Sequence, residues 1–327
     1  MTWNLPLAFD AGRRHLLAAA LLATALPPAR AATYPDKPIR IVVPFTAGSA
    51  TDTAGRVLAS GLADRLGVAV VIDNKAGAGG VIGSASVAQA APDGHTLVLT
   101  SSSTHSAAGA LVSKVPYDGT EDFVHIVRIA TIPLALVVRQ ESKAGSVAGL
   151  QELARQQLLN YAYGSAASQI AASTFAGLAG IKTLGVPYRS QPPAVTDLLG
   201  GQVDFLFADL SVVKAFIDSG RLRALAVSAP ERVQALPGVA TLRELGFSHF
   251  DLVVWVGLAA PRGTPAAIIE RLSSEAVAVL REPAVVARLS GAGMDVSPNS
   301  LQEQRLFAVE QKRAWMARAA AAGVVPQ

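Results

Sequence analysis

Small residues and hydroxyls follow the first β-rich run of the chain, and they could bind an anion. Residues 44–52 read PFTAGSATD and lead straight into a helical pattern. The start of a helix leaves main-chain N–H groups without partners, and the positive end of the helix dipole favours negative charge there. This loop therefore predicts an anion site that needs neither Lys nor Arg.

Two further loops follow strand-like runs. Residues 73–83 are rich in glycine, and residues 100–105 read TSSSTH, a run of hydroxyls that can bond an oxygen-rich ligand. Taken singly, each loop is more simply explained by helix capping and by Gly/Ser turns. Open parallel sheets, however, bind ligands outside the carboxyl ends of their strands. Three such loops at equivalent strand ends favour a ligand cleft.

Two enzymatic interpretations compete with a binding role. The glycines at 77, 79 and 83 follow G-x-G-x-x-x-G rather than the dinucleotide pattern G-x-G-x-x-G, and the next strand ends in Thr100-Ser101 without an acidic residue. No G-x-S-x-G nucleophile motif occurs. We predict no catalytic residue, and the alternative left open is an exported α/β enzyme that uses Ser103 or His105.

The composition excludes several kinds of site. The chain has 0 Cys, so it has no disulfide, no thiolate zinc site and no cysteine nucleophile. Its 5 His lack metal-ligand spacing. Lys and Arg form no stripe interleaved with aromatic residues, which argues against nucleic acid as a partner. We predict no metal, no cofactor and no nucleic acid.

The elements that must position these loops alternate along the 327 residues. Strands are expected at 39–43, 68–72, 96–100, 129–138, 203–207, 224–228 and 252–258. Helices are expected at 52–66, 146–158, 168–179, 192–199 and 210–219, and capping signals near 264, 282 and 300 predict three more at the C-terminal end. This alternation predicts an α/β fold with a mostly parallel sheet.

Residues 1–31 have the features of an export signal. Arg13-Arg14 form a basic region, an apolar run too short to span a bilayer extends to Leu26, and Ala29-Arg30-Ala31 is an A-x-A cleavage site. A buried N-terminal helix is the less favoured alternative. The arginine pair leaves Sec and twin-arginine export both open. We expect the mature protein in the periplasm.

Several motifs together resemble a known family. They are the segments 34–39 (YPDKPI), 44–52, 74–80 (NKAGAGG), 103–105 (STH), 186–188 (VPY) and 197–204 (DLLGGQVD). In this order and at this spacing they are similar to the Bug family, the periplasmic substrate-binding receptors of tripartite tricarboxylate transporters. The likeness runs from about Tyr34 to the C-terminus.

The resemblance implies a type II periplasmic-binding-protein-like fold, with two α/β domains around a ligand cleft. The signal peptide would be 1–31, domain 1 would be 32–133 plus 255–327, and domain 2 would be 134–254. The domains would be joined by crossover strands near 131–136 and 251–257 rather than by a Pro/Gly linker.

The resemblance also implies a clamp for a small carboxylate, with main-chain amides of the first loop on one end and domain 2 on the other. The ligand-binding candidates come from both halves. They are Phe45, Ala47, Gly48, Ser49, Asp52, Ser103, Thr104, His105, Ser165, Ala166, Tyr188 and Asp209. We expect Asp52 to orient the loop or a water rather than to touch the anion.

The sequence departs from the family where domain 2 should meet the ligand. The loop 163–169 is shorter than usual, and Ala208-Asp209 stands where Asp-Asn is frequent. If Asp209 faces the cleft, it would repel a dicarboxylate and favour a ligand with an amine or hydroxyl. We expect the protein to act as a monomer. Its expected partners are a small organic acid or amino-acid-like carboxylate, and membrane transporter subunits or a sensor kinase. The alternative is a ligand-poor receptor that acts mainly on a sensor partner.

Overall fold

The computed structural model describes residues 1–3, 34–248 and 250–326. Residues 37–327 form one compact unit, and residues 1–36 form a separate one. The described residues of the separate unit, 1–3 and 34–36, carry no helix or strand. Residues 4–31, which hold the basic, apolar and cleavage features of the predicted export signal, lie outside the described residues.

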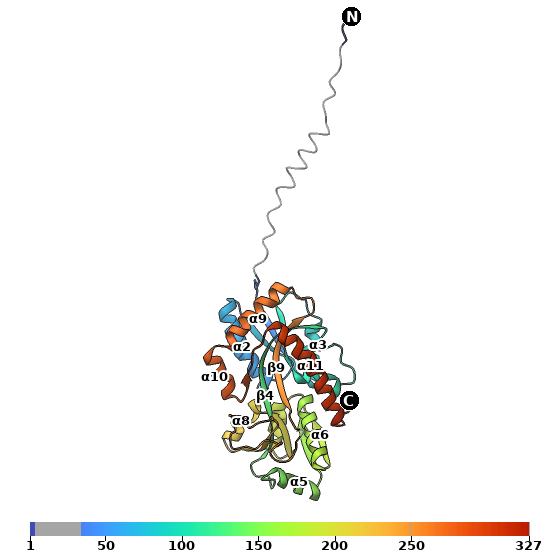
Figure 1. The fold of residues 1–327 in the computed structure, drawn as a ribbon, viewed down its shortest axis with the longest axis vertical. Helices are drawn as coiled ribbons and strands as arrows, with labels where there is room; N and C mark the ends of the chain where they lie inside the picture. Colours follow the sequence, from blue (N-terminus) through green and yellow to red (C-terminus); the bar gives the residue numbers. More distant parts are fainter. Residues whose placement is uncertain (4–33, 249, 327) are drawn as a thin grey trace. The chain divides into compact units, whose positions relative to one another are not determined.

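A first sheet carries the parallel strands β1 (Ile39–Val43), β2 (Val70–Asn74) and β3 (Thr96–Ser101), with β1 in the middle. β1 is almost completely buried apart from Arg40, as its β-branched residues Ile39, Ile41, Val42 and Val43 predict. Helices contact these three strands or the strand at residues 123–139. They are α2 (Ala50–Leu66), α3 (Val81–Ala88), α9 (Ala266–Leu280) and α11 (Leu301–Ala321) (Figure 1). We call this sheet with its helices the first lobe.

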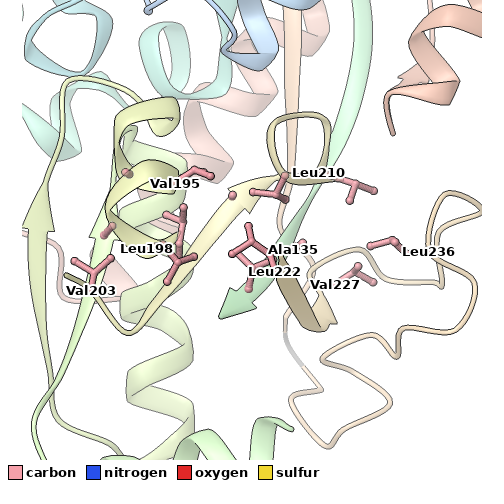
Figure 2. Close-up of a cluster of buried hydrophobic side chains, with 14 residues drawn as sticks. Ala135, Val195, Leu198, Val203, Leu210, Leu222, Val227 and Leu236 are labelled. Atoms are coloured by element: carbon pink, nitrogen blue, oxygen red, sulfur yellow. The ribbon is translucent and has the colours of Figure 1, made fainter. Parts of the chain in front are cut away.

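A second sheet carries β5 (Leu159–Tyr163), β6 (Thr183–Pro187) and β7 (Phe205–Asp209), which are parallel, and also β8 (Leu222–Val227). Its helices are α5 (Val147–Gln156), α6 (Ala166–Ala179), α7 (Gln191–Leu199) and α8 (Leu210–Asp218). We call this sheet with its helices the second lobe. Leu198 of α7, Leu210 of α8 and Leu222 of β8 belong to one buried apolar cluster that holds this lobe together (Figure 2).

One long strand passes through both lobes, and a second strand runs beside its first part. β4 (Phe123–Arg139) pairs with β9 (Val253–Pro261) as far as Pro133, and from Leu134 onward it pairs with β7 and β8. Pro133 therefore sits at the change of partner, where a residue without an N–H group disrupts the ladder least. Figure 1 shows β4 and β9 running side by side between the two sets of helices.

Ser228 ties the two strands together at this change of partner. The Leu134 amide donates to the Ser228 hydroxyl at 2.9 Å, and the same hydroxyl donates to the Leu252 carbonyl. Main-chain bonds add to these, from the Ser228 amide to the Leu134 carbonyl and from the Leu252 amide to the Ser228 carbonyl. Ser228 is completely buried, so this crosslink is shielded from water.

The remaining elements are short. They are the turns η1 (Ala78–Gly80) and η2 (Ser102–Ser106), the helices α4 (Ala108–Leu111) and α10 (Pro283–Gly291), and β10 (Asp295–Val296), which pairs with β4. Within the described part of the chain, no helix has both the length and the apolar character needed to cross a bilayer.

The structure corrects the expected sheet. Among the described residues, four strand pairings are parallel and five are antiparallel, so the sheet is mixed rather than mostly parallel. The reason is that β4 and β9 run back between the parallel sets. β5 and β6 were not expected. β6 contains Gly185, ends in Pro187 and pairs only with β5, a composition that an edge strand tolerates.

Candidate ligand-binding site

A small pocket of about 20 Å³ lies where the two lobes meet. The first lobe contributes Phe45, Ser49, Thr51, Ser101, Ser102 and Ser103, the second lobe contributes Gly164, Ser165, Gln191 and Asp209, and β9 contributes Val254, Trp255 and Val256. A wider hollow beside α5 is lined only by residues of the second lobe and of the segment 238–248. Movement of one lobe against the other could enclose a ligand in the pocket between them, but not in this hollow.

The start of α2 forms one wall of the pocket. The Ser49 side chain caps the helix by accepting a bond from the Asp52 amide at 3.2 Å, and the Thr53 amide bonds the Ser49 carbonyl. Within the described residues, the amides of Ala50 and Thr51 in this first turn have no hydrogen-bond partner. Thr51 lines the pocket, so unused N–H groups and the positive end of the α2 dipole lie at its wall.

Asp52 organises the loop from behind. Its carboxylate accepts bonds from the Gly48 amide at 3.0 Å, from Asn74 Nδ2 at 2.9 Å and from Arg56 Nε at 3.0 Å. Burial alone would raise the pKa of Asp52, but the bonds from Arg56, Gly48 and Asn74 outweigh it and lower that pKa below its usual value. Asp52 therefore stays charged and is occupied by its neighbours rather than by the pocket.

The glycine-rich segment 73–83 supports the first loop and does not line the pocket. Asn74 Nδ2 also donates to the Phe45 carbonyl at 3.0 Å. Gly83 lies so close to the first loop that a Cβ on it would be 2.6 Å from the Lys75 carbonyl oxygen and 2.9 Å from Pro44 Cα. The glycines serve backbone packing here, which explains why their spacing departs from a dinucleotide motif.

Some residues of the hydroxyl-rich segment 100–105 line the pocket, and others face the protein interior. β3 extends to Ser101, and η2 is a turn of π-helix that begins at Ser102. Ser101, Ser102 and Ser103 line the pocket. The Thr104 side chain instead forms a reciprocal capping box with Ser101.

His105 points into an aromatic cluster. Its ring lies 4.6 Å from that of Phe123 and 5.6 Å from that of His125, between centroids, and Nδ1 is 2.8 Å from Thr104 Oγ1. Burial, with a smaller contribution from His125, lowers the pKa of His105 well below its usual value. The imidazole is therefore neutral.

The second lobe supplies a helix start and a carboxylate. Ser165 caps α6 by accepting from the Ser168 amide at 3.2 Å, and Gln191 Nε2 donates to Ser165 Oγ at 3.5 Å. Gln191 Oε1 accepts from the Asp209 amide at 2.8 Å. Gln191, which is 3 % exposed, thus holds the end of β7 beside the start of α6.

Asp209 occupies the N-cap position of α8, yet its side chain makes no capping bond. Asp209 instead lines the pocket. Burial raises the pKa of Asp209 to about 6, and a hydrogen bond with Gln191 opposes part of this rise.

Two hydrogen bonds cross the cleft. The Ala167 amide in the first turn of α6 donates to Ser103 Oγ at 3.2 Å, and the hydroxyls of Thr46 and Ser190 bond each other. Each pair joins one residue of the first lobe to one of the second. The structure is therefore that of closed lobes.

Two pocket residues carry polar groups that no described residue satisfies. Ser102 is completely buried and its hydroxyl has no partner, and Trp255, which is 1 % exposed, has an unpartnered Nε1. Buried polar groups in native proteins nearly always have a partner. An unpaired hydroxyl in the pocket wall indicates that something polar completes the site.

Seven of the residues predicted from the sequence do not line the pocket, and Asp52, described above, is one of them. Ala47 and Gly48 are exposed, and the Gly48 amide is already bonded to Asp52. Thr104 and His105 turn inward as described, and Ala166 is buried beneath Ser165 at the start of α6. The Tyr188 hydroxyl donates to Asp197 at 2.7 Å, which holds its ring against the core of the second lobe.

Other pocket residues were not predicted. Thr51, Ser101 and Ser102 lie in the predicted loops 44–52 and 100–105, although they were not among the named candidates. Trp255 and its neighbours come from the crossover strand β9. The sequence placed that strand at the hinge, and a strand crossing between two lobes must also form the floor of the cleft, a signal that could have identified them.

Two α/β lobes that share the long strand β4 and close over a polar pocket define a solute-binding protein with the type II periplasmic-binding architecture. A family model described as "Tripartite tricarboxylate transporter family receptor" matches residues 54–323. The chain belongs to this family, which confirms the resemblance noted in its sequence, and it is a solute-binding receptor.

Individual relatives agree with this assignment. BugT of Bordetella pertussis is 37% identical over 293 residues, which cover 88% of this chain and 90% of BugT. An R. palustris protein solved with adipate is 29% identical with a TM-score of 0.87, over 90% of this chain and 100% of its own. MatC from Rhodopseudomonas palustris, solved with malate, is 30% identical with a TM-score of 0.84, over 88% and 100%.

Proposed function

We propose that this protein captures a small carboxylate in the periplasm and delivers it to the membrane subunits of a tripartite tricarboxylate-type transporter. The observation that carries the proposal is the free first turn of α2 in the pocket wall. Two main-chain N–H groups without partners, at Ala50 and Thr51, meet the positive end of a helix dipole there. Fixed dipoles of this kind stabilise an anion without a paired cation.

The pocket lining supports a carboxylate. It contains no Lys, Arg or His, but it offers the hydroxyls of Ser101 and Ser102 beside the α2 amides. Relatives solved with adipate and with malate use the same fold. Hydroxyls and amides recognise oxygen atoms through hydrogen bonds, which suits an oxygen-rich acid better than an apolar solute.

We assign the lobes to residues 32–133 plus 255–327 and to residues 134–254. The change of partner in β4 between Pro133 and Leu134, and the start of β9 at Val253, support these boundaries. A ligand that contacts both lobes favours the closed state by the difference in its affinity for closed and open forms. The bonds from Ser103 to Ala167 and from Thr46 to Ser190 would then form on closure.

The arrangement of Ser103 and His105 gives no support to the enzymatic alternative. Within the described residues, Ser103 Oγ is bonded to the Ala167 amide and not to the imidazole, which is bonded to Thr104 instead. A serine nucleophile needs a base within hydrogen-bond reach. We therefore propose a binding protein without catalytic activity that acts as a monomer, with a sensor kinase as the alternative partner.

The test is ligand binding by the purified protein. Melting temperature and calorimetric affinity are measured with adipate, malate, succinate, citrate and aspartate, and with adipamide as an uncharged control. Binding to the folded state raises its stability. A receptor that captures a carboxylate therefore shows a higher Tm with at least one acid and an unchanged Tm with adipamide. If no acid shifts the Tm, or if adipamide binds as tightly as adipate, the proposal fails and the ligand-poor receptor is favoured.

A further inference from the structure

The pocket contains one ionisable side chain, and that side chain is acidic. Among the thirteen residues that line it, only Asp209 can carry a charge near neutral pH. The Asp209 carboxylate does not cap α8, and no ion pair joins it to any Lys, Arg or His of the described residues. Asp209 is half-buried, and a carboxylate so shielded without a positive partner is costly unless it takes up a proton or the ligand brings a cation.

The opposite wall has the opposite polarity. Ser49 and Thr51 belong to the first lobe, where the start of α2 presents free N–H groups, whereas Asp209 ends β7 in the second lobe. Gln191 fixes the Asp209 main chain in place through the 2.8 Å bond to its amide. When the lobes close, the start of α2 and Asp209 therefore approach the same ligand from different sides.

We propose that Asp209 selects a ligand that bears an ammonium group as well as a carboxylate, so that the receptor prefers a small amino acid to the corresponding plain acid. This inference rests on the proposed function and narrows its ligand class. The carboxylate of the ligand lies at the start of α2, and its ammonium donates to Asp209. A dicarboxylate without an amine would place a second negative charge near Asp209, where like charges repel.

Asp209 is the group that titrates at this end of the pocket, because the residues around it are uncharged or already paired. α6 contains no charged residue, and it presents Ser165 and Ser168 towards β7. On α7, Asp197 is bonded to Tyr188, and on α8, Lys214 is bonded to Asp218. β4 faces Asp209 with Leu134. Because burial raises the pKa of Asp209 to about 6, this carboxyl is mostly protonated at pH 5 and mostly charged at pH 7.5.

The test compares acids of one skeleton that differ in a single group. Calorimetry measures the affinity of aspartate, malate and succinate, and of 4-aminobutanoate, 4-hydroxybutanoate and butanoate, at pH 7.5. In at least one series we expect the ammonium compound to bind about tenfold or more tightly than the compound without a polar substituent, the size expected for a charged hydrogen bond. Asp209→Asn should reduce this preference about tenfold. Asp64→Asn, which removes an exposed carboxylate from α2, should leave it unchanged.

The wild-type protein provides a second arm that needs no variant. At pH 5 the preference for the ammonium compound should shrink as it does in Asp209→Asn, once each affinity is corrected for the fraction of that ligand whose carboxylates are charged at this pH. If wild type binds acids without preferring an ammonium, or if neither Asp209→Asn nor pH 5 alters the preference, the inference is wrong and the proposed function stands. If no acid binds to wild type at all, both are wrong.

Discussion

The hydroxyl of Ser103 accepts a hydrogen bond from the main-chain amide of Ala167 across the cleft, at 3.2 Å. Both groups are nearly excluded from water, and Ser103 also lines the pocket. One side chain therefore takes part in lobe closure and in the ligand site, which makes closure and binding energetically coupled.

Removing this contact should weaken ligand binding without unfolding either lobe. For Ser103→Ala we expect about a fivefold loss of affinity, which corresponds to one hydrogen bond of about 1 kcal/mol. Solution scattering should show a larger fraction of open protein at equal ligand concentration. Ser274→Ala, an exposed serine on α9, is the control and should change neither quantity. Wild-type affinity in Ser103→Ala would show that the contact does not favour closure.

The unpartnered hydroxyl of Ser102 predicts a different effect. Ser102→Ala removes a buried group that has no protein partner, so the free energy of unfolding should stay the same or rise slightly. Affinity for the captured acid should fall about fivefold or more, because the hydroxyl lines the pocket.

Ser106→Ala is the matched control for Ser102→Ala. Ser106 is in the same turn and is also buried and unpartnered, but it does not line the pocket. Its substitution should leave the affinity unchanged. Equal losses in the two variants would assign the effect to the turn rather than to the ligand.

Asp52 predicts a loss of stability at acid pH. Its pKa is lowered in the folded protein, so folding favours its charged form. This contribution is complete above the unfolded pKa, near 4, and is lost as the pH falls further through the folded pKa. Chemical denaturation should therefore show less pH dependence below about pH 4 in Asp52→Asn than in wild type. At neutral pH this variant should be less stable by about 1–3 kcal/mol, because donors that faced the carboxylate lose their acceptor.

Asp64→Asn is again the control for that experiment, since Asp64 is exposed on the same helix. It should follow the wild-type pH profile. An Asp52→Asn profile that is parallel to wild type down to pH 2 would mean that the carboxylate does not stabilise the loop.

Gly164 predicts a steric limit in the pocket wall. A Cβ on Gly164 would lie 2.1 Å from the Ser190 carbonyl carbon, so Gly164→Ala must push the start of α7 away. We expect a loss of about 1–3 kcal/mol or more in unfolding free energy, together with weaker ligand binding. Gly177→Ala is the matched control, because a Cβ there, in the last turn of α6, meets nothing within 4 Å. It should raise stability by about 0.5–1 kcal/mol. Similar Tm values for both variants would contradict the close approach.

The sequence predicted the architecture because apolar periodicity and capping residues act locally. The capping box of Ser300 and Glu303 forms as expected at the start of α11, and Pro283 begins α10. β4 changes its pairing partner after Pro133, within the segment 131–136 expected to cross between the domains, and its role as a hinge stays a prediction. The edge strand β6 was missed because Gly185 and Pro187 hide a short strand whose pairing is set by a distant partner.

The pocket residues were less predictable because they depend on the direction of each side chain. His105 and Ser103 are two positions apart, yet one packs on Phe123 while the other crosses the cleft, because η2 adopts a π-helical turn. The bond from the Gly48 amide to Asp52 likewise depends on a left-handed φ of 79° at Gly48, which no spacing rule reveals. Local pattern thus locates the loops, and tertiary packing decides which of their atoms are free.

The crosslink that Ser228 makes to Leu134 and Leu252 lies outside the pocket lining. The stiffness of the two connecting strands is thereby encoded by a residue that is not part of the ligand-contacting surface. Ser103 couples closure to the ligand site, whereas Ser228 acts on the connecting strands without lining that site. Mutation could tune how quickly cargo is released while leaving untouched which cargo is chosen.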